Sequence, residues 1–438
     1  MFEISDFNGE KNSNHILEEY YVNCISNALK RIHFGGSVYQ SKLLDFDVSY
    51  QNVTSLNDIE SLPFTTKADF QDNYPYGLFA VPTSEVIRIH SSSGTKSKPK
   101  IVGYTKNDIR NWGALVLRCL MMHGLSKEDI VLNSFGYGMF TGGLGLQLGV
   151  EASGATLIPA STGKTAKQID LLRDLGATVL LSTPSFAMHL SDESEKINFD
   201  IAKSPLRLGF MGAEPWPDNM KSQIEKRLGI KAVNIYGLSE IMGPGVGIED
   251  PDDSDSLILW GDHFYVEIVN EKGELVPDGC YGELVITSFL KEAIPLIRYR
   301  TGDITRIIKR NGLYGVWVER IASRSDDMLI VKGVNIFPSQ VGAVLCNYSD
   351  LSPYYLLEIE RRGFSDNVIL NVELARGKHN LERSHIYNVS ENLKKYLKDE
   401  LGIYIDVKMY NPGVLERFTS KRQTVNDKRE NAGSGYIV

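Results

Sequence analysis

A run of polar residues at positions 91–100, SSSGTKSKPK, carries the side chains best suited to bind phosphate. Hydroxyl and backbone N–H groups can surround a phosphate, Gly94 lets the backbone approach it closely, and lysines supply the countercharge. The run is not the common P-loop, because it lacks G-x-x-x-x-G-K-[ST] and no helix follows directly. A phosphate-binding loop and a solvated surface loop both remain open from these residues alone.

The elements on either side must position this loop. Apolar, β-prone residues precede it at 86–89 and follow it at 101–104, so we expect two strands joined by the loop. Thr105 and Asp108 have the spacing of a capping box, which predicts a helix from there through Leu120. Downstream, helices closed by Gly176 and Gly229 alternate with strands at 130–134, 155–159, 178–181 and 232–236. This alternation predicts an α/β domain with a largely parallel sheet.

The pattern changes twice towards the C-terminus. Short apolar runs separated by polar turns follow Pro251 and indicate an antiparallel β region. Beyond Asp326 we expect a small α+β domain with a helix at 339–346, a hairpin at 362–363, a long helix at 386–401 and a strand at 405–409. The predicted domains are therefore residues 1–325, with a β-rich subdomain at about 251–325, and a mobile C-terminal domain at 326–438.

Composition narrows the classes of function. The chain has 438 residues, 42% of them hydrophobic, which is enough for two or three domains. A formal charge of −8 argues against a general nucleic-acid binder. The N-terminus lacks a signal-peptide pattern and no apolar run is long enough to cross a membrane. The cysteines (Cys24, Cys119, Cys280 and Cys346) lie far apart without C-x-x-C. We expect a cytoplasmic protein with reduced thiols and no membrane partner.

Motifs of the chain follow one another in a fixed order: RIHSSSGT (88–95), GYGMFTGG (136–143), GAEPW (212–216), YGLSE (236–240), RYRTGD (298–303) and SRSDDMLI (323–330). Together they resemble the adenylate-forming superfamily of acyl-CoA synthetases, and within it the phenylacetate–CoA ligases and other aryl-CoA ligases. The resemblance covers residues 60–345 well and the rest more loosely. It implies an AMP-binding ligase that uses ATP, Mg²⁺ and coenzyme A to activate a carboxylate, here an aromatic or arylacetic acid.

The resemblance also assigns residues to the nucleotide. It implies that the β- and γ-phosphates bind to Ser91, Ser92, Ser93, Gly94, Thr95 and Lys98. Glu240 matches the glutamate that holds Mg²⁺, and Asp303 the aspartate that accepts hydrogen bonds from the ribose hydroxyls. Arg324 resembles the arginine that reaches the nucleotide. Tyr236, Gly237, Ser239, Ala213 and Glu214 would complete the nucleotide site.

Other positions take the remaining roles of the family. Lys421 matches the lysine that stabilises charge at the α-phosphate, and Glu240 and Arg324 complete the catalytic set. The acid would lie near Tyr137, Phe140, Gly142, Ala213 and Pro215. Asp326 resembles the hinge of the C-terminal domain, and Lys332 and Gly333 would face coenzyme A. His90, a lone histidine at a strand end, is left outside the catalytic set.

The chain departs from the family pattern at several places. Lys96 and Ser97 stand where the phosphate loop of relatives has threonine and glycine, and Glu416 and Ser420 replace proline and glycine near Lys421. The cysteines of a zinc site found in many relatives are missing, so we expect no structural zinc.

Alternatives to a CoA ligase remain open. Within the same fold, the adenylate could instead pass to a carrier-protein thiol, or the AMP could be joined to another small molecule. A homodimer is the protein assembly that stays open. The alternative from another class of function is a homologue that binds nucleotide without catalysing a reaction. Retention of Glu240, Asp303, Arg324 and Lys421 argues against it.

Overall fold

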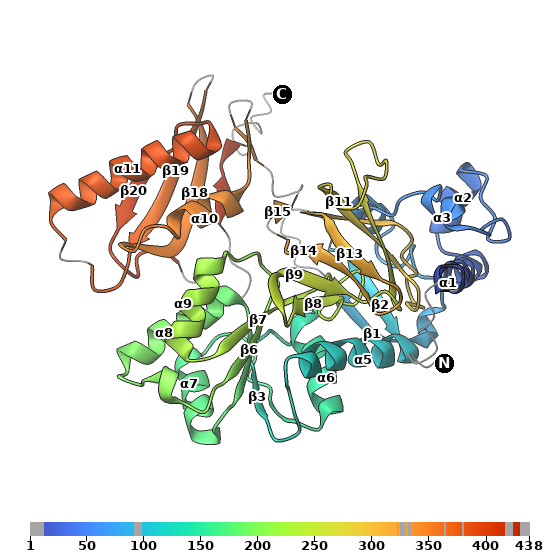
Figure 1. The fold of residues 1–438 in the computed structure, drawn as a ribbon, viewed down its shortest axis with the longest axis horizontal. Coiled ribbons are helices and arrows are strands. Elements are labelled where there is room, and N and C mark those ends of the chain that lie inside the picture. Colours follow the sequence, from blue (N-terminus) through green and yellow to red (C-terminus); the bar gives the residue numbers. More distant parts are fainter. Residues whose placement is uncertain are drawn as a thin grey trace, which may run out of the picture.

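The computed structural model describes residues 13–91, 99–321, 323–324, 329–331, 334–362, 365–378, 381–416 and 424–429. A large N-terminal domain carries a small C-terminal domain beside its helices α8 and α9 (Figure 1). Each domain has its own buried apolar core, and the core of the small domain draws only on residues from Leu329 onward. The predicted class, an α/β domain with β-rich parts and a small α+β domain, is confirmed.

A nine-stranded sheet of the described residues forms the centre of the large domain. Strands β4, β3, β5, β6 and β7 run parallel in that order. Their bounds are Thr156–Ile158, Ile130–Asn133, Val179–Ser182, Leu208–Met211 and Lys231–Tyr236. The buried faces of these strands read as nearly continuous apolar runs, as expected for a sheet with helices on both faces.

Helices connect the parallel strands. They are α6 (Gly142–Ser153), α7 (Thr165–Leu175), α8 (Pro184–Lys196) and α9 (Asp218–Leu228), and α5 (Lys106–Met122) precedes β3. The capping box predicted at Thr105 and Asp108 is confirmed, with the Thr105 side chain accepting from the Asp108 N–H and the Asp108 side chain accepting from the Thr105 N–H. Gly176 and Gly229 end α7 and α9 in the left-handed conformation, which glycine adopts without strain.

The β-rich region does not form a separate layer throughout. Strand β7 pairs antiparallel with β8, and β9, β14 and β13 then continue the same sheet. Their bounds are Gly247–Asp250, Asp253–Leu259, Gly315–Glu319 and Ile307–Asn311. The change of sequence pattern near Pro251 therefore marks a change from parallel to antiparallel pairing. The same nine-stranded sheet continues across this change.

A second sheet has the order β10, β11, β12 and β15 within the described ranges. These strands span Phe264–Val269, Gly282–Ser288, Tyr299–Thr305 and Ser323–Arg324. The N-terminal helices α1 (Ser13–Gly35), α2 (Tyr39–Asp45), α3 (Leu56–Glu60) and α4 (Lys67–Asp72) precede β1 (Val86–Ser91) and β2 (Ile101–Thr105). Strands β1 and β2 pair antiparallel on either side of the lysine-rich run, as predicted.

The small domain packs helices on one sheet. Strands β18 (Leu351–Arg362) and β19 (Ser365–Leu374) pair antiparallel, with β20 (Asp406–Tyr410) and β21 (Val425–Asp427) parallel at the two edges. Helices α10 (Pro338–Leu345) and α11 (Arg383–Leu401) and the short strands β16 (Leu329–Val331) and β17 (Val334–Ile336) complete it. The predicted helices and hairpin strands are confirmed. No helix among the described residues is long and apolar enough to cross a membrane.

Asp262 joins distant parts of the large domain. The Arg118 guanidinium donates to both of its carboxylate oxygens, at 2.9 and 2.7 Å, and the Tyr20 hydroxyl donates to its backbone carbonyl at 2.7 Å. Burial by itself would raise the pKa of Asp262, but the contacts from His263 and Arg118 outweigh it and hold the pKa well below its ordinary value. Helices α1 and α5 are thereby tied to the turn before β10.

We predict that Asp262→Asn lowers the free energy of unfolding by about 1–3 kcal/mol at pH 7, because Arg118 loses a charged partner. The folded-state pKa lies below the unfolded one, so this stabilisation is complete above about pH 5 and is lost as the pH falls below about 4. Urea unfolding at pH 7 and pH 3 measures it, with the exposed Asp170→Asn as the control. A difference between variant and parent that grows at low pH would contradict the assignment.

Candidate functional site

Turns that follow three of the parallel strands lie at one edge of the central sheet. Strands β3, β6 and β7 end at Asn133, Met211 and Tyr236, with β5 between β3 and β6, and the motifs at 136–143, 212–216 and 236–240 begin within three residues of these ends. The Ser91 N–H donates to the Met139 carbonyl at 2.8 Å, which brings the start of the lysine-rich run to the same edge. Ligands of open α/β sheets bind outside the carboxyl ends of strands, so this edge is the candidate site.

Glu240 is the buried acid of the site, with 3% of its surface exposed. Lys100 forms an ion pair with its Oε1 atom, and the Tyr299 hydroxyl donates to the same atom at 3.0 Å. Burial would raise the pKa of Glu240, but the charge and hydrogen bond of Lys100 outweigh it and lower the pKa. The carboxylate is therefore kept ionised inside the protein.

Lys291 holds the backbone of Glu240. Its Nζ atom donates to the Glu240 backbone carbonyl and lies 4.8 Å from the centre of the Tyr104 ring. Burial lowers the pKa of Lys291 to about 8, although the charges of Asp108 and Glu240 oppose the shift. The following segment is anchored by Asp108, whose carboxylate accepts from the Glu292 and Ala293 N–H groups at 2.6 and 3.0 Å.

Asp303 forms a second acidic centre on the strand that carries Tyr299. Its carboxylate accepts from the Tyr236 hydroxyl and from Arg324 Nη1, the latter at 2.8 Å. Arg324 also donates to the Thr301 carbonyl at 2.9 Å. Tyr299, Thr301 and Asp303 all lie on β12. Strand β12 thus links Glu240 to Asp303, and an ionised carboxylate can accept hydrogen bonds from several donors at once.

Close backbone approaches explain the glycines in these turns. A Cβ atom on Gly212 would lie 2.3 Å from the Ile235 carbonyl oxygen, and one on Gly237 would lie 2.5 Å from the Gly243 Cα atom. A larger residue at Gly212 would push the 212–216 turn away from β7, and one at Gly237 would push the 236–240 turn away from the segment that follows it. Ala213 has φ of +71°, a conformation unusual for a residue with a side chain. The motifs are therefore constrained by packing as well as by any ligand.

The glycine-rich turn at 136–143 presents rings at the same edge. Burial raises the pKa of Tyr137 to about 12, and its hydroxyl accepts from Asn133 Nδ2 at 2.9 Å. The Phe140 ring is 37% exposed, and a Cβ atom on Gly142 would meet that ring at 3.1 Å. These residues, predicted to contact the acid, do lie together.

The remaining predicted residues differ in their exposure and their contacts. Ala213 and Pro215 are exposed, whereas Glu214 Oε1 accepts from the Ser185 N–H at 2.7 Å and so also caps the first turn of α8. Ser239 is buried, with its hydroxyl 3.0 Å from that of Thr141. His90 is buried against the Tyr104 and Trp112 rings, and its Nδ1 atom lies 3.1 Å from the Met139 carbonyl oxygen. That environment is consistent with a packing role for His90.

Several predicted residues lie outside the described part of the chain. They are Ser92, Ser93, Gly94, Thr95 and Lys98 of the loop, Asp326 of the hinge, Lys332 and Gly333 on the CoA side, and Lys421. The roles assigned to them stay predictions.

Lys100, Lys291 and Tyr299 were missed as site residues. Lys100 ends the lysine-rich run that is predicted to bind phosphate, so its position was a usable signal. Tyr299 lies within the RYRTGD motif, where only Asp303 was singled out. Lys291 stands among apolar residues far from Glu240 in sequence, and nothing local indicates that its ammonium group ends beneath the Glu240 backbone.

Glu240 offers a hard cation one carboxylate ligand, so such a cation would have to bring its other ligands with it. In the described ranges no group of three or more histidine, cysteine, aspartate or glutamate side chains could hold a metal ion. Mg²⁺ is commonly bound by one or two carboxylates together with phosphate oxygens and water. Glu240 fits that pattern, with nucleotide phosphates supplying the remaining oxygens.

Fold and site together define an adenylate-forming enzyme, and comparison with known proteins agrees. The family model for AMP-binding enzymes matches residues 47–289, and the model for the AMP-binding enzyme C-terminal domain matches residues 333–429. The chain is 43% identical to the phenylacetate-coenzyme A ligase of Pseudomonas putida, over 94% of each chain. It is 44% identical to that of Escherichia coli K12, over 93% of each. The chain belongs to the phenylacetate–CoA ligase family of AMP-forming acid–thiol ligases.

Solved structures give the same fold. Crystal structures of 2-hydroxyisobutyryl-CoA ligase cover most of this chain at 22–23% identity. Its postadenylation state, in complex with 2-HIB-AMP, has a TM-score of 0.87, covering 94% of this chain and 90% of that one. Its thioesterification state has a TM-score of 0.68, covering 97% and 91%.

We predict that Lys100→Met and Glu240→Gln each destabilise the protein, Lys100→Met by about 3 kcal/mol, because removing Lys100 strands a buried carboxylate. The double variant should lose less than the sum of the two single losses, since no unpaired charge is left. Urea unfolding of the four proteins measures the coupling. Strictly additive losses would show that the Lys100–Glu240 pair does not form.

Proposed function

We propose that this chain joins an arylacetic acid, phenylacetate in the first instance, to coenzyme A at the expense of ATP, releasing AMP and pyrophosphate. The observation that carries the proposal is the linkage of Glu240 and Asp303 through β12 at the carboxyl edge of the sheet. Phenylacetate-coenzyme A ligases at 39–44% identity over about nine-tenths of the chain support the choice of acid.

The first half-reaction brings two anions together. A carboxylate oxygen of the acid attacks the α-phosphorus of ATP, the bond from that phosphorus to the bridging oxygen breaks, and pyrophosphate leaves. Asp303 would accept from the ribose hydroxyls, with Tyr236 and Arg324 holding its carboxylate in place. We assign Ser91, Ser92, Ser93, Gly94, Thr95 and Lys98 to the β- and γ-phosphates, and Lys421 to the α-phosphate charge.

Positive charge near the α-phosphate offsets the repulsion between the carboxylate of the acid and the phosphates of ATP. When bound, Mg²⁺ would neutralise phosphate charge, with Glu240 as its protein ligand. Lys100, paired with Glu240 before the nucleotide arrives, is placed to contact the phosphates as well. Tyr299 and Lys291 hold Glu240 by its side chain and by its backbone.

The acid would lie over the turn at 136–143. The rings of Tyr137 and Phe140, with Gly142, Ala213 and Pro215 beside them, suit the flat face of an aryl group. Gly237, Ser239 and Glu214 would border the adenylate. In the second half-reaction the coenzyme A sulfur attacks the acyl carbonyl, AMP leaves, and the thiol proton passes to solvent.

We further propose that the C-terminal domain begins at a hinge at Asp326 and that Lys332 and Gly333 guide the thiol. The arrangement of the two domains resembles the postadenylation state of 2-hydroxyisobutyryl-CoA ligase more than its thioesterification state, with TM-scores of 0.87 and 0.68 at nearly equal identity. This supports reading the present arrangement as the one that serves adenylation.

The direct test is pyrophosphate release from ATP and Mg²⁺ with a panel of arylacetic, aromatic and aliphatic acids, each with and without coenzyme A. We expect release with arylacetic acids, increased by coenzyme A. Release that coenzyme A leaves unchanged would favour a carrier-protein thiol as acceptor. Tight ATP binding without release for any acid would contradict the ligase.

We predict that Asp303→Asn raises the Kd for ATP about ten-fold or more, because the ribose loses a charged acceptor. Isothermal titration with ATP measures the affinity, and Asp278→Asn, in the surface pair with Arg310, is the matched control. An ATP affinity equal to that of the parent would refute the placement of the ribose at Asp303.

A further inference from the structure

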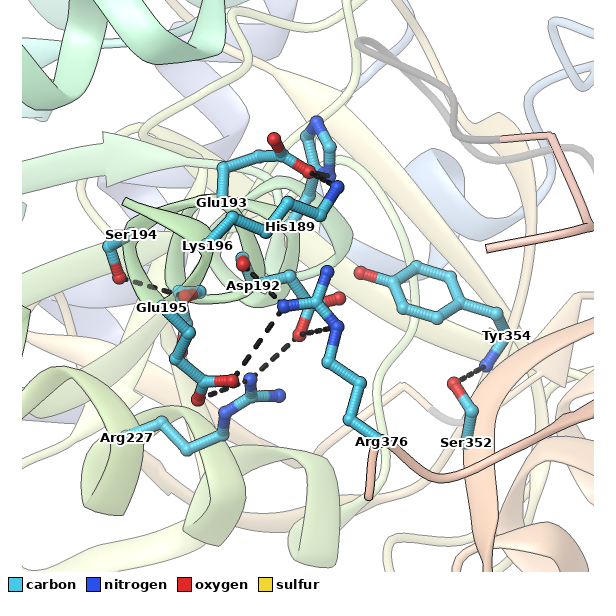
Figure 2. Close-up of polar contacts among 11 residues, drawn as sticks. His189, Asp192, Glu193, Ser194, Glu195, Lys196, Arg227, Ser352, Tyr354 and Arg376 are labelled. Atoms are coloured by element: carbon cyan, nitrogen blue, oxygen red, sulfur yellow. Dashed lines mark hydrogen bonds and ion pairs between the residues drawn. The ribbon is translucent and has the colours of Figure 1, made fainter. Parts of the chain in front are cut away.

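An ion-pair cluster joins the two domains at helix α8 (Figure 2). Arg376 of the small domain donates to the Asp192 backbone carbonyl, and its guanidinium nitrogens lie 3.8 Å from Asp192 Oδ1 and 3.7 Å from Glu195 Oε2. Arg227 of α9 binds the same two acids from the other side, at 2.7 and 3.0 Å. Asp192, only 7% exposed at its side chain, therefore lies between two arginines.

The charge on α8 explains why an arginine from the other domain is stabilising here. Asp192, Glu193 and Glu195, which we call the α8 acid cluster, occupy the C-terminal part of the helix, where the helix dipole disfavours negative charge. Burial opposes ionisation of Glu193, but Lys196, His189 and Arg376 outweigh it and lower its pKa. Of these cations, Arg376 belongs to the small domain and would move away from α8 together with it.

An aromatic side chain makes the second contact between the domains. Tyr354 on β18 is 8% exposed and belongs to a buried apolar cluster in which every other described member lies between residues 130 and 232. The ring therefore packs into the core of the large domain, next to Arg376 (Figure 2). Nearby, Asn219 of α9 donates to the Cys346 carbonyl at the end of α10. The contact combines charge, apolar burial and a hydrogen bond.

We propose that Arg376 and Tyr354 are positioning residues that latch the C-terminal domain onto α8 in the arrangement used for adenylation, and that the latch must open for thioester formation. Arg376 and Glu195 are partly exposed, so their ion pair contributes little by itself, whereas Asp192 and Tyr354 are buried and add to the contact. Neither residue contacts Glu240 or Asp303 in the described structure, so both act through domain position. The functional part rests on the proposed two-step reaction, whereas the contact itself does not.

The contact is tested by amide hydrogen exchange without turnover. Arg376→Glu should speed exchange in α8 about three-fold and Tyr354→Ala should speed it more, while α7 stays unchanged. Arg361→Glu is the matched control, because Arg361 pairs with Asp366 inside the small domain and 57% of its side chain is exposed. Parental exchange in α8 for both variants would overturn the latch whatever the enzyme's substrate is.

The function of the latch is tested on the two half-reactions separately. In Arg376→Glu, ATP–pyrophosphate exchange should fall about three-fold, while thioester formation from supplied acyl-adenylate should not fall. Adding Glu195→Arg to Arg376→Glu swaps the two charges of the pair and should restore part of the lost ATP–pyrophosphate exchange. Equal loss of both half-reactions, or no recovery in the double variant, would overturn the positioning role. Absence of pyrophosphate exchange in the parent would instead count against the proposed function.

Discussion

The site depends on keeping one carboxylate ionised inside the protein. Glu240 is nearly inaccessible, and burial alone would favour its neutral form. Lys100 offsets that cost at the side chain, Tyr299 donates to the same oxygen, and Lys291 holds the backbone. These partners come from the position just before β2, from β12 and from the segment before β12, so the carboxylate can be satisfied only when several distant parts of the chain have folded together.

Buried polar contacts also connect the site to the packing around it. Lys291 is itself buried and lies beside Asp108, the capping residue of α5, whose carboxylate also binds the backbone at Glu292 and Ala293. A helix start, a loop and an active-site acid are thus joined in one polar network. Such networks are stabilising only when each member has a partner, which explains why the residues at this edge are constrained beyond their contact with ligands.

The contact between the two domains differs from the packing inside each of them. The core of the large domain is continuous across its parallel and antiparallel strands, whereas the small domain has a core of its own and meets α8 and α9 through Arg376, Tyr354 and a hydrogen bond from the Asn219 side chain to the Cys346 carbonyl. A contact of so few side chains, with Arg376 and Glu195 partly exposed, is small enough to open. That difference in strength is what a two-step reaction with one shared site would need, because the site must be rebuilt between steps.

Local sequence determined the elements and the chemistry. Hydrophobic periodicity, the capping box at Thr105 and the glycines at 176 and 229 predicted helices and strands correctly, because these signals act within a few residues. The motifs around Glu240 and Asp303 indicated the ligase family for the same reason. Tertiary structure alone decided that Lys100 meets Glu240, that the sheet continues past Pro251, and that Arg376 reaches α8. Those contacts join residues between roughly ten and nearly two hundred positions apart, and sequence spacing carries no information about which distant charges a fold will bring together.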